Sequence, residues 1–354
     1  MLWHRHEIKP LSYHTEEPIP PCAAMYKLGV FRVEDYRPDH PGLIGRLLWK
    51  LNRYRISLRL LRTEIPASPK EIAVFEALMQ GLRLNSGIYR TTFHGRFRNL
   101  DQFVNQVLVE RYDSAAALDI HDWAASDCLT SSEWAASVLP LFPNARLEAS
   151  DLTLFLVEVS YGKHTVIQER DGQALQYIAP SFLVDLSRPE LRPSALARLM
   201  MRRARSIIAE VQSRLAIPVT WLDSESDSLS HPPFEVRKLP MIHPEAALFQ
   251  MRDARFSIAR HSAFEVLSKP ADVIRSMNFY NLGYFEPPQL VEGAKAVWRS
   301  LKPGGVWIVG RTWQEDPPSH NVSIFERTDA GFQLAGRYGD GSEIESLVLA
   351  QTLL

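Results

Sequence analysis

Between residues 115 and 313 the chain alternates short apolar runs with amphipathic segments, and this alternation constrains the fold more than any other feature of the sequence. The apolar runs predict strands at 116–122, 145–152, 255–264, 271–281 and 304–313. The amphipathic segments predict helices at 130–141, 195–216 and 289–301. Strands that alternate with helices of this length are typical of a doubly wound, mainly parallel sheet. Residues 115–354 are therefore predicted to form an α/β domain.

An insertion at about 154–240 interrupts this pattern. The stretch LFLVEVSYGKHTVIQERDGQALQYI contains Tyr-Gly and Asp-Gly turn signals between alternating runs, which is typical of antiparallel β-hairpins. The polar stretch 221–233 predicts a loop. The C-terminal stretch VSIFERTDAGFQLAGRYGDG predicts further antiparallel strands, which are common at the edge of a mainly parallel sheet.

The N-terminal third has a different character. Residues 1–42 are rich in proline and histidine without a sustained period, and we interpret them as an irregular arm. Residues 43–114 predict a helical subdomain. Within it, Ser68, Pro69 and Glu71 match the cap, first position and third position of a helix that begins with a capping box.

The composition is ordinary for a globular protein, with 45% hydrophobic and 23% charged residues. The formal net charge of -1 gives no reason to expect a nucleic-acid partner. Two cysteines, Cys22 and Cys128, are too few for a disulfide framework or a zinc site, so no metal is expected. No apolar run approaches the ~20 residues of a membrane span, and no signal peptide is recognisable. We therefore expect a cytoplasmic protein.

The segment SLKPGGVWIVGRT, residues 300–312, is the most specific motif of the chain. Its Pro-Gly-Gly lets a helix stop and the chain reverse before the next strand, because glycine readily takes a positive φ. With the preceding strand, asparagine-containing loop and helix, it resembles the closing half of class I S-adenosylmethionine (SAM)-dependent methyltransferases. The resemblance implies a Rossmann-like fold and SAM as cofactor.

The first motif of that family is an acid followed by glycines at every second position. Counted from Asp122, the matching positions are Ala124, Ser126 and Cys128, which are small but are not glycines. A count from Asp119 gives bulky residues instead, so we prefer the Asp122 register. The loop must then either avoid positive φ or bear strain. An ordinary strand-to-helix turn without ligand is the alternative interpretation.

The resemblance implies that Asp122 accepts a hydrogen bond from the cofactor's ammonium. The start of the following helix, near Asp127, would favour the cofactor's carboxylate. It also implies that Asp151 binds the ribose hydroxyls and that Leu152 packs on the adenine, although Asp151 could instead cap a helix. Two more residues complete the predicted cofactor site, Ser262 in the place of a family acid and Phe264, for which a core position is the alternative.

The stretch Met277–Phe285 follows the predicted fourth strand and is similar, through Arg311, to chemotaxis-receptor glutamate methyltransferases. The residues expected to line the methyl-transfer site are Asn278, Tyr280, Asn281 and Tyr284. Tyrosine and asparagine are also usual at strand ends, which is the alternative interpretation. No general base stands out, and an ionised carboxylate acceptor would need none because proximity supplies most of the rate.

Two basic amphipathic segments, 46–62 and 198–214, could contact an anionic membrane surface or an acidic protein. Alternatively, their arginines are simply solvated while the apolar stripe packs inward.

The sequence as a whole predicts a SAM-dependent methyltransferase that acts on a small molecule, a lipid-like acceptor or a carboxylate. The alternative is a catalytically inactive protein of the same fold that serves as a scaffold or subunit of a biosynthetic complex.

Overall fold

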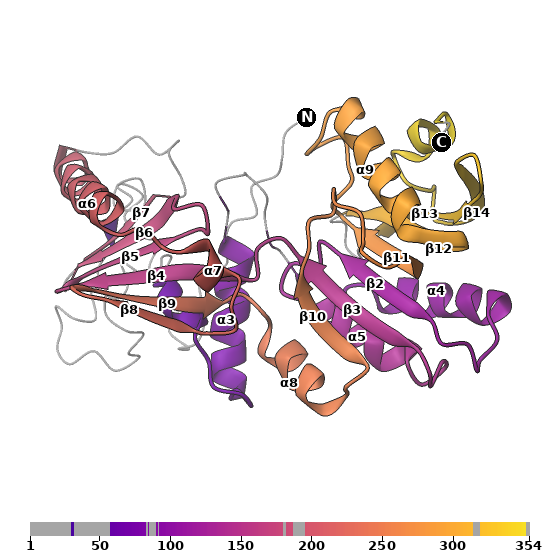
Figure 1. Ribbon diagram of the computed structural model, residues 1–354, viewed down its shortest axis with the longest axis horizontal. Coiled ribbons are helices and arrows are strands. Elements are labelled where there is room, and N and C mark those ends of the chain that lie inside the picture. Colours follow the sequence, from indigo (N-terminus) through magenta and orange to yellow (C-terminus); the bar gives the residue numbers. More distant parts are fainter. Residues whose placement is uncertain are drawn as a thin grey trace. The chain divides into compact units, whose positions relative to one another are not determined.

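A computed structural model of the chain describes residues 30–31, 57–82, 84, 90, 92–179, 182–186, 195–313 and 319–351. The predicted arm at 1–42 lies outside these residues except for 30–31. The chain divides into two units, each of which combines two stretches of sequence (Figure 1). Unit 1 comprises Met1–Thr91 and Phe155–Met241, and unit 2 comprises Thr92–Leu154 and Ile242–Leu354.

Unit 2 contains a seven-stranded sheet in the order β10-β3-β2-β11-β12-β13-β14. The first five strands are mutually parallel, and β13 and β14 add an antiparallel edge. The strands are β2 (Asp119–Trp123), β3 (Arg146–Asp151), β10 (Phe256–Arg260), β11 (Ala271–Met277), β12 (Leu301–Trp313), β13 (Ser319–Arg327) and β14 (Phe332–Tyr338). The prediction of a mainly parallel α/β sheet with antiparallel C-terminal strands is confirmed.

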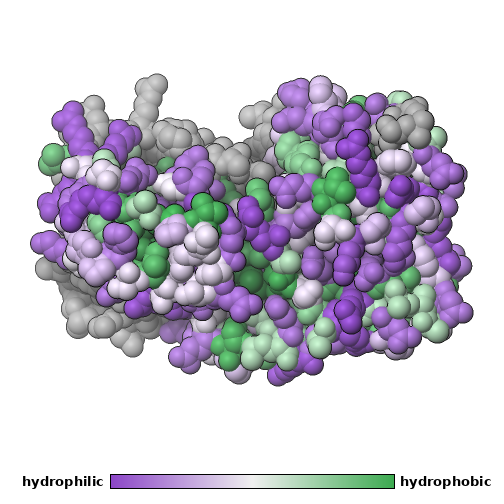
Figure 2. Space-filling model, in the orientation of Figure 1, coloured by the Kyte–Doolittle hydropathy of each residue, from purple (hydrophilic) through white to green (hydrophobic). Residues whose placement is uncertain are grey.

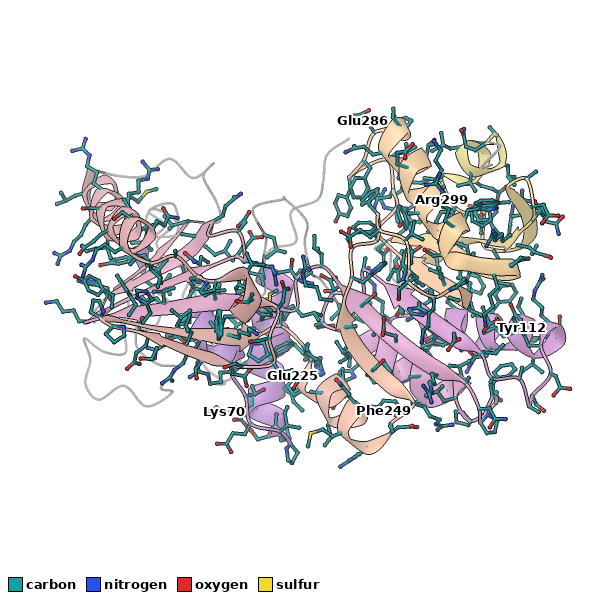
Figure 3. All side chains as sticks on the ribbon, viewed as in Figure 1. Lys70, Tyr112, Glu225, Phe249, Glu286 and Arg299 are labelled. Carbon is teal, nitrogen blue, oxygen red and sulfur yellow. The ribbon has the colours of Figure 1, made fainter. Side chains whose placement is uncertain are left out.

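Helices cover both faces of this sheet because neighbouring residues of a strand point to opposite sides. The helices are α4 (Arg98–Arg111), α5 (Leu129–Val138), α8 (Pro244–Arg252), α9 (Pro287–Ser300) and the short α10 (Glu345–Leu349). Val273 belongs to the core shared with α4, α5 and α8, whereas Ile274 belongs to the core shared with α9 and α10. On the first face, α8 carries Phe249 (Figure 3). The Phe249 ring packs on that of Phe256, with ring centroids 5.3 Å apart.

Unit 1 is built on an antiparallel seven-stranded sheet in the order β1-β7-β6-β5-β4-β9-β8. Its strands are β1 (Val30–Phe31), β4 (Phe155–Tyr161), β5 (His164–Gln168), β6 (Ala174–Ala179), β7 (Phe182–Asp185), β8 (Ser228–His231) and β9 (Phe234–Pro240). One face packs on η1 (Leu58–Leu61) and α3 (Pro69–Gly81), and the other on α6 (Ala195–Arg214) and α7 (Val219–Leu222). The predicted hairpins are therefore present. The stretch 221–233 was expected to be a loop, yet it contains β8, a mostly exposed edge strand whose one-sided pairing tolerates polar residues.

The predicted helical subdomain at 43–114 differs from the observed division of the chain. Helix α3 lies in unit 1, where Phe75 and Met79 join the core of the antiparallel sheet. Helix α4 lies in unit 2, where Leu100 and Val104 join the core of the parallel sheet. A helix is assigned to a core by what its apolar stripe contacts, and sequence proximity alone does not decide this.

Two local predictions agree with the structure. Ser68 and Glu71 form the capping box of α3, with Glu71 Oε2 accepting from the Ser68 amide at 2.8 Å. At the Pro-Gly-Gly motif, α9 ends at Ser300 and β12 begins at once, with Gly304 at a φ of +76°. A Cβ at Gly305 would lie 2.9 Å from the Lys302 carbonyl oxygen, so the close backbone approach there needs glycine.

The basic segment 198–214 belongs to α6, and the segment 46–62 lies mostly outside the described residues. On α6 the arginines Arg202, Arg203 and Arg205 are exposed, and Ala204 and Ile208 pack inward. The outer surface over α6 is largely hydrophilic (Figure 2). A membrane or acidic-protein contact through these arginines stays a prediction. Among the residues that the structure describes, no helix combines the length and the apolar character needed to span a bilayer.

Candidate functional site

The carboxyl ends of the parallel strands of unit 2 meet at one edge of the sheet, which is where open α/β sheets bind ligands. The predicted site residues directly follow four of these strands. The loop 124–128 follows β2, Leu152 follows Asp151 at the end of β3, Ser262 follows β10, and Asn278 follows β11. The topology therefore collects the predicted residues from across the sequence at a single edge.

The loop after β2 is strained at every second residue. Ala124, Ser126 and Cys128 have φ values of +56°, +59° and +64°, in the left-handed region that favours glycine. These are the three positions counted from Asp122. The sequence left two possibilities, that the loop avoids positive φ or that it bears strain, and the structure has the second. Each such residue costs of order 1–3 kcal/mol and persists only where its surroundings fix it.

Hydrogen bonds hold this loop against the neighbouring strand β3. The amide of Ala125 donates to the Ser150 carbonyl at 2.9 Å, and the amide of Ser126 donates to Asp151 Oδ2 at 2.9 Å. Cys128 is fully buried and forms the N-cap of α5. The loop is thus a preformed cradle at the start of a helix, the geometry that favours an anionic group.

Asp122 lies beneath this cradle in a buried ion-pair network. Its Oδ1 accepts from Arg275 Nε at 3.0 Å, and its Oδ2 accepts from Arg275 Nη2 at 2.5 Å and from the Ser131 hydroxyl at 2.6 Å. Arg275 Nη1 donates to Asp101 Oδ1 at 2.7 Å, and its guanidinium lies 4.1 Å from the ring centroid of Trp134. The role of Asp122 as acceptor of the cofactor's ammonium stays a prediction, but the residue is only 3% exposed and its carboxylate already accepts from Arg275 and Ser131.

The second carboxylate of this network, that of Asp101, has a raised pKa. Burial raises the pKa of Asp101 to about 7, because removing the carboxylate from water disfavours its charged form more than the adjacent Arg275 favours it. The neighbouring charges of Asp122 and Glu133 raise this pKa further.

Asp151 is half-buried at the end of β3 and shapes the turn that follows. Its Oδ2 accepts from the Ser126 amide and its Oδ1 from the Thr153 amide, both at 2.9 Å. The interpretation of Asp151 as a helix cap is wrong, because β4 begins at Phe155 and no helix follows. The side chain of Leu152 is 51% exposed beside it.

The loop after β10 carries the other predicted cofactor residues. Ser262 Oγ accepts from the Phe264 amide at 3.4 Å. The ring of Phe264 packs edge-on against Phe279 and Phe285, with ring centroids 5.8 Å and 5.1 Å away, and remains 36% exposed. A part of this ring is therefore in the core and a part is free to contact a ligand.

The loop after β11 is held in shape by its own polar side chains. Asn278, at a φ of +61°, accepts from the Thr312 amide through Oδ1 at 2.6 Å. Tyr280 is buried and donates its hydroxyl to the Ala263 carbonyl. Asn281 is also buried and donates to the Asn278 carbonyl at 3.0 Å. Tyr284 keeps partial exposure.

Residues that the sequence did not single out complete this edge. Burial lowers the pKa of Arg96 to about 10, and the nearby Tyr284 and Asp127 oppose that shift. His320 Nδ1 lies 3.1 Å from Thr312 Oγ1, and burial lowers the pKa of this histidine. No local pattern marks these residues, because they reach the edge from segments far apart in the chain.

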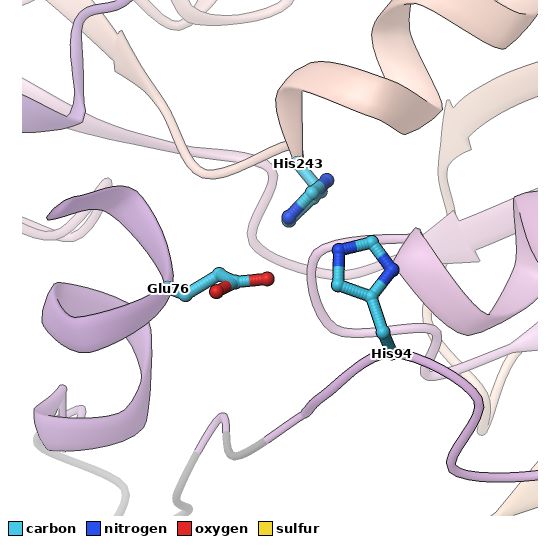
Figure 4. Close-up of side chains that lie close together, drawn as sticks. All are labelled: Glu76, His94 and His243. Atoms are coloured by element: carbon cyan, nitrogen blue, oxygen red, sulfur yellow. The ribbon is translucent and has the colours of Figure 1, made fainter. Parts of the chain in front are cut away.

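One histidine, His243 at the start of α8, bonds to the cradle, and a second, His94, lies beside it (Figure 4). The buried His243 donates its backbone amide to the Asp127 carbonyl at 2.8 Å and caps α8 by accepting from the Glu245 amide through Nδ1 at 3.2 Å. The ring of His94 lies edge-on to that of His243, with centroids 5.5 Å apart, and its Nδ1 lies 3.4 Å from Glu133.

Comparisons with known proteins found no matching family model and no matching curated protein. Among solved structures, the chain is similar to an O-methyltransferase family protein from Burkholderia thailandensis, with 13% identity over 62% of this chain and 40% of that one and a TM-score of 0.27. It is also similar to the sugar N-methyltransferase KedS8 from Streptoalloteichus, with 11% identity over 67% and 69% of the two chains and a TM-score of 0.27. A third match is PKMT2 from Rickettsia typhi in complex with AdoHcy, with 7% identity over 56% and 22% and a TM-score of 0.25. The chain thus spans about two fifths of the first of these proteins and about a fifth of the third. At these identities and TM-scores the matches carry no argument, and the functional conclusion depends on the geometry of unit 2.

Proposed function

We propose that the chain is a SAM-dependent methyltransferase whose cofactor binds at the carboxyl edge of the unit 2 sheet. The observation that carries this proposal is the cradle after β2, where Ala124, Ser126 and Cys128 all take the left-handed conformation. A chain does not keep three strained residues in one loop without a reason, and strain of this kind clusters at ligand sites.

Each part of the cofactor has a candidate partner at this edge. The backbone of the cradle, which includes Asp127 and Cys128, and the first turn of α5 would hold the methionine portion. Asp151 would accept from the ribose hydroxyls, since a carboxylate can accept further bonds beside those from Ser126 and Thr153. Leu152, Ser262 and Phe264 would surround the adenine. Asp122 would support the cradle from beneath, as its oxygens already have partners.

The loop after β11 would position the methyl acceptor. When bound, the cofactor would supply a methyl group from its sulfonium sulfur, and the neutral thioether S-adenosylhomocysteine would be the leaving group. We assign contact with the acceptor to the half-buried Asn278 and Tyr284, and loop support to the buried Tyr280 and Asn281. Alignment at short distance supplies most of the rate for an ionised acceptor such as a carboxylate. An acceptor of higher pKa would need a general base. His320 is the candidate, because it contacts Thr312, which in turn bonds to Asn278.

One observation favours the alternative of an inactive protein with this fold. The Ser126 amide donates to Asp151, and the acid of the first motif pairs with Arg275, so protein groups occupy some of the positions that a cofactor could use. A scaffold or subunit of a biosynthetic complex would keep these contacts without binding SAM.

Titration with S-adenosylhomocysteine separates the two functions. At ~100 times its dissociation constant, the ligand should stabilise the protein by about 2.7 kcal/mol, measured by thermal or urea unfolding. Asp151→Asn should weaken binding because it loses charge at the ribose site. The matched control is Asp119→Asn, at the opposite end of the neighbouring strand and exposed. The enzyme proposal fails if neither SAM nor S-adenosylhomocysteine shifts the unfolding transition at millimolar concentration.

A further inference from the structure

Arg275 connects both ends of the strained cradle to the centre of the sheet. From β11 it donates through Nε and Nη2 to Asp122, which lies in β2 two residues before the cradle. Its Nη2 also lies 3.4 Å from the Thr130 carbonyl, in the first turn of α5 beyond the cradle. Ser131 closes the arrangement by donating its hydroxyl to Asp122 at 2.6 Å. We call these four residues, Arg275, Asp122, Thr130 and Ser131, the clamp.

The clamp brackets the three left-handed residues. Ala124, Ser126 and Cys128 all lie between Asp122 and Thr130, and none of them is a glycine. A short loop of such residues relaxes toward negative φ unless its ends are fixed, because the left-handed region is unfavourable for a residue with a Cβ. Fixed ends remove the room for this relaxation. In glycine-containing loops the same conformation needs no such restraint.

We propose that Arg275 is a positioning residue that holds the glycine-less cradle in its cofactor-binding conformation by fixing Asp122 and the first turn of α5. With Arg275 in place, the loop keeps three positive φ values that would otherwise require glycines. The part of this inference that concerns cofactor affinity rests on the proposed function, and the part that concerns the shape of the loop does not.

The two aspartates around Arg275 form a matched pair for testing this role. Both are buried and both pair with the same guanidinium, Asp101 at 2.7 Å through Nη1 and Asp122 at 2.5 Å through Nη2. Asp122 lies two residues before the cradle, whereas Asp101 belongs to α4 and its carboxylate accepts from Nη1 of Arg275. Above a pH of about 8, where Asp101 is ionised, Asp101→Asn and Asp122→Asn therefore each remove one negative charge from beside Arg275, but only the second loosens the clamp.

Hydrogen exchange in the ligand-free protein tests the loop directly. In Asp122→Asn we expect the amides of Ser126 and Cys128 to exchange about tenfold faster. Exchange occurs from a locally opened loop, and a weaker clamp raises the equilibrium constant for this opening, here by about one factor of ten. The amide of Ile308, in the centre of β12, should be unchanged, and Asp101→Asn should leave the cradle amides unchanged. Equal effects of the two variants on the cradle, or none from either, would overturn the proposal.

Affinity for S-adenosylhomocysteine, measured by calorimetry, gives the second readout. Asp122→Asn should bind about tenfold more weakly than the parent, and Asp101→Asn should bind as the parent does. Introducing Ala124→Gly, Ser126→Gly and Cys128→Gly together should recover most of the affinity that Asp122→Asn loses, because glycines need no clamp. A loss that the glycines do not recover would mean that Asp122 contacts the ligand itself and would overturn the positioning role.

A variant that fails to fold is replaced by Ser131→Ala, which removes one bond to Asp122 and keeps the ion pair. It should show a smaller change in the same direction in the cradle amides, and no change would count against the clamp. If the parent protein binds no S-adenosylhomocysteine, the proposed function fails, and the exchange comparison still decides whether Arg275 holds the loop.

Discussion

At the scale of single residues, the buried guanidinium of Arg275 shows how a charged group is stabilised inside unit 2. It is fully buried, and it lies against the carboxylates of Asp122 and Asp101 and the ring of Trp134. Removing one partner of a buried ion pair strongly destabilises the fold, because an unpaired charge remains in a medium of low polarity. Here two partners share the charge, so one of them, Asp101, can hold a proton near neutral pH without leaving Arg275 unpaired.

The raised pKa of Asp101 predicts a specific dependence of stability on pH. Its folded pKa of about 7 lies above the unfolded value, so the folded state binds the proton more tightly and this residue's contribution falls as the pH rises from about 4 to about 7. Asp101→Asn does not titrate. Its stability relative to the parent should therefore increase with pH across this window, by up to about 1.4 kcal/mol per unit.

Urea unfolding at pH 5, 6, 7 and 8 measures this difference. Asp329→Asn, in the exposed turn between β13 and β14, is the control and should run parallel to the parent. Parallel profiles for Asp101→Asn as well would show that Asp101 titrates normally.

At the scale of elements, the pairing of β12 with β13 fixes the position of the site residues at the end of β12. The two strands are in register from Val306 opposite Glu326 to Trp313 opposite Ser319. Thr312, which holds Asn278, and His320 lie opposite each other in this ladder. The strands approach so closely at Gly310 that a Cβ there would lie 2.3 Å from the Asn321 carbonyl oxygen.

Gly310→Ala should therefore destabilise unit 2 by at least about 1–3 kcal/mol, because the backbone of β13 has to move. Gly336→Ala, in β14, is the matched control, since the nearest atom to its added Cβ lies 3.9 Å away. It should change stability by less than about 1 kcal/mol. Thermal unfolding of the two variants makes the comparison, and equal tolerance of both would contradict the close approach.

At the scale of the whole molecule, each of the four hydrophobic cores among the described residues lies within one unit. The two cores of unit 2 draw on residues 97–154 and 242–348, and the two cores of unit 1 draw on residues 58–84 and 155–241. A compact unit with its own core is expected to fold independently. The division also explains why the helices of the N-terminal third belong to different sheets.

A shortened chain in which a short linker joins residues 92–154 to residues 242–354 should therefore fold. In unit 1, Phe155 and Pro240 are opposite residues of β4 and β9, so the two ends of the removed segment are neighbours and a short glycine-serine linker suffices. We expect one cooperative thermal transition and dispersed amide resonances. A chain with retained helicity but no cooperative transition would show that unit 2 depends on the rest of the molecule.

The sequence by itself determined the strands of the unit 2 sheet, its helices α5 and α9, and the hairpins from β4 to β6 of unit 1, because period and turn residues act over a few positions. It also determined the register of the cradle, since Asp122, Ala124, Ser126 and Cys128 are spaced along one loop. Only the tertiary structure decided which helix joins which core, that the cradle bears its strain, and that Asp122 faces Arg275, which lies 153 positions away. That pairing follows from β2 lying beside β11. Which strands become neighbours depends on the packing of the whole sheet, and no local pattern contains it.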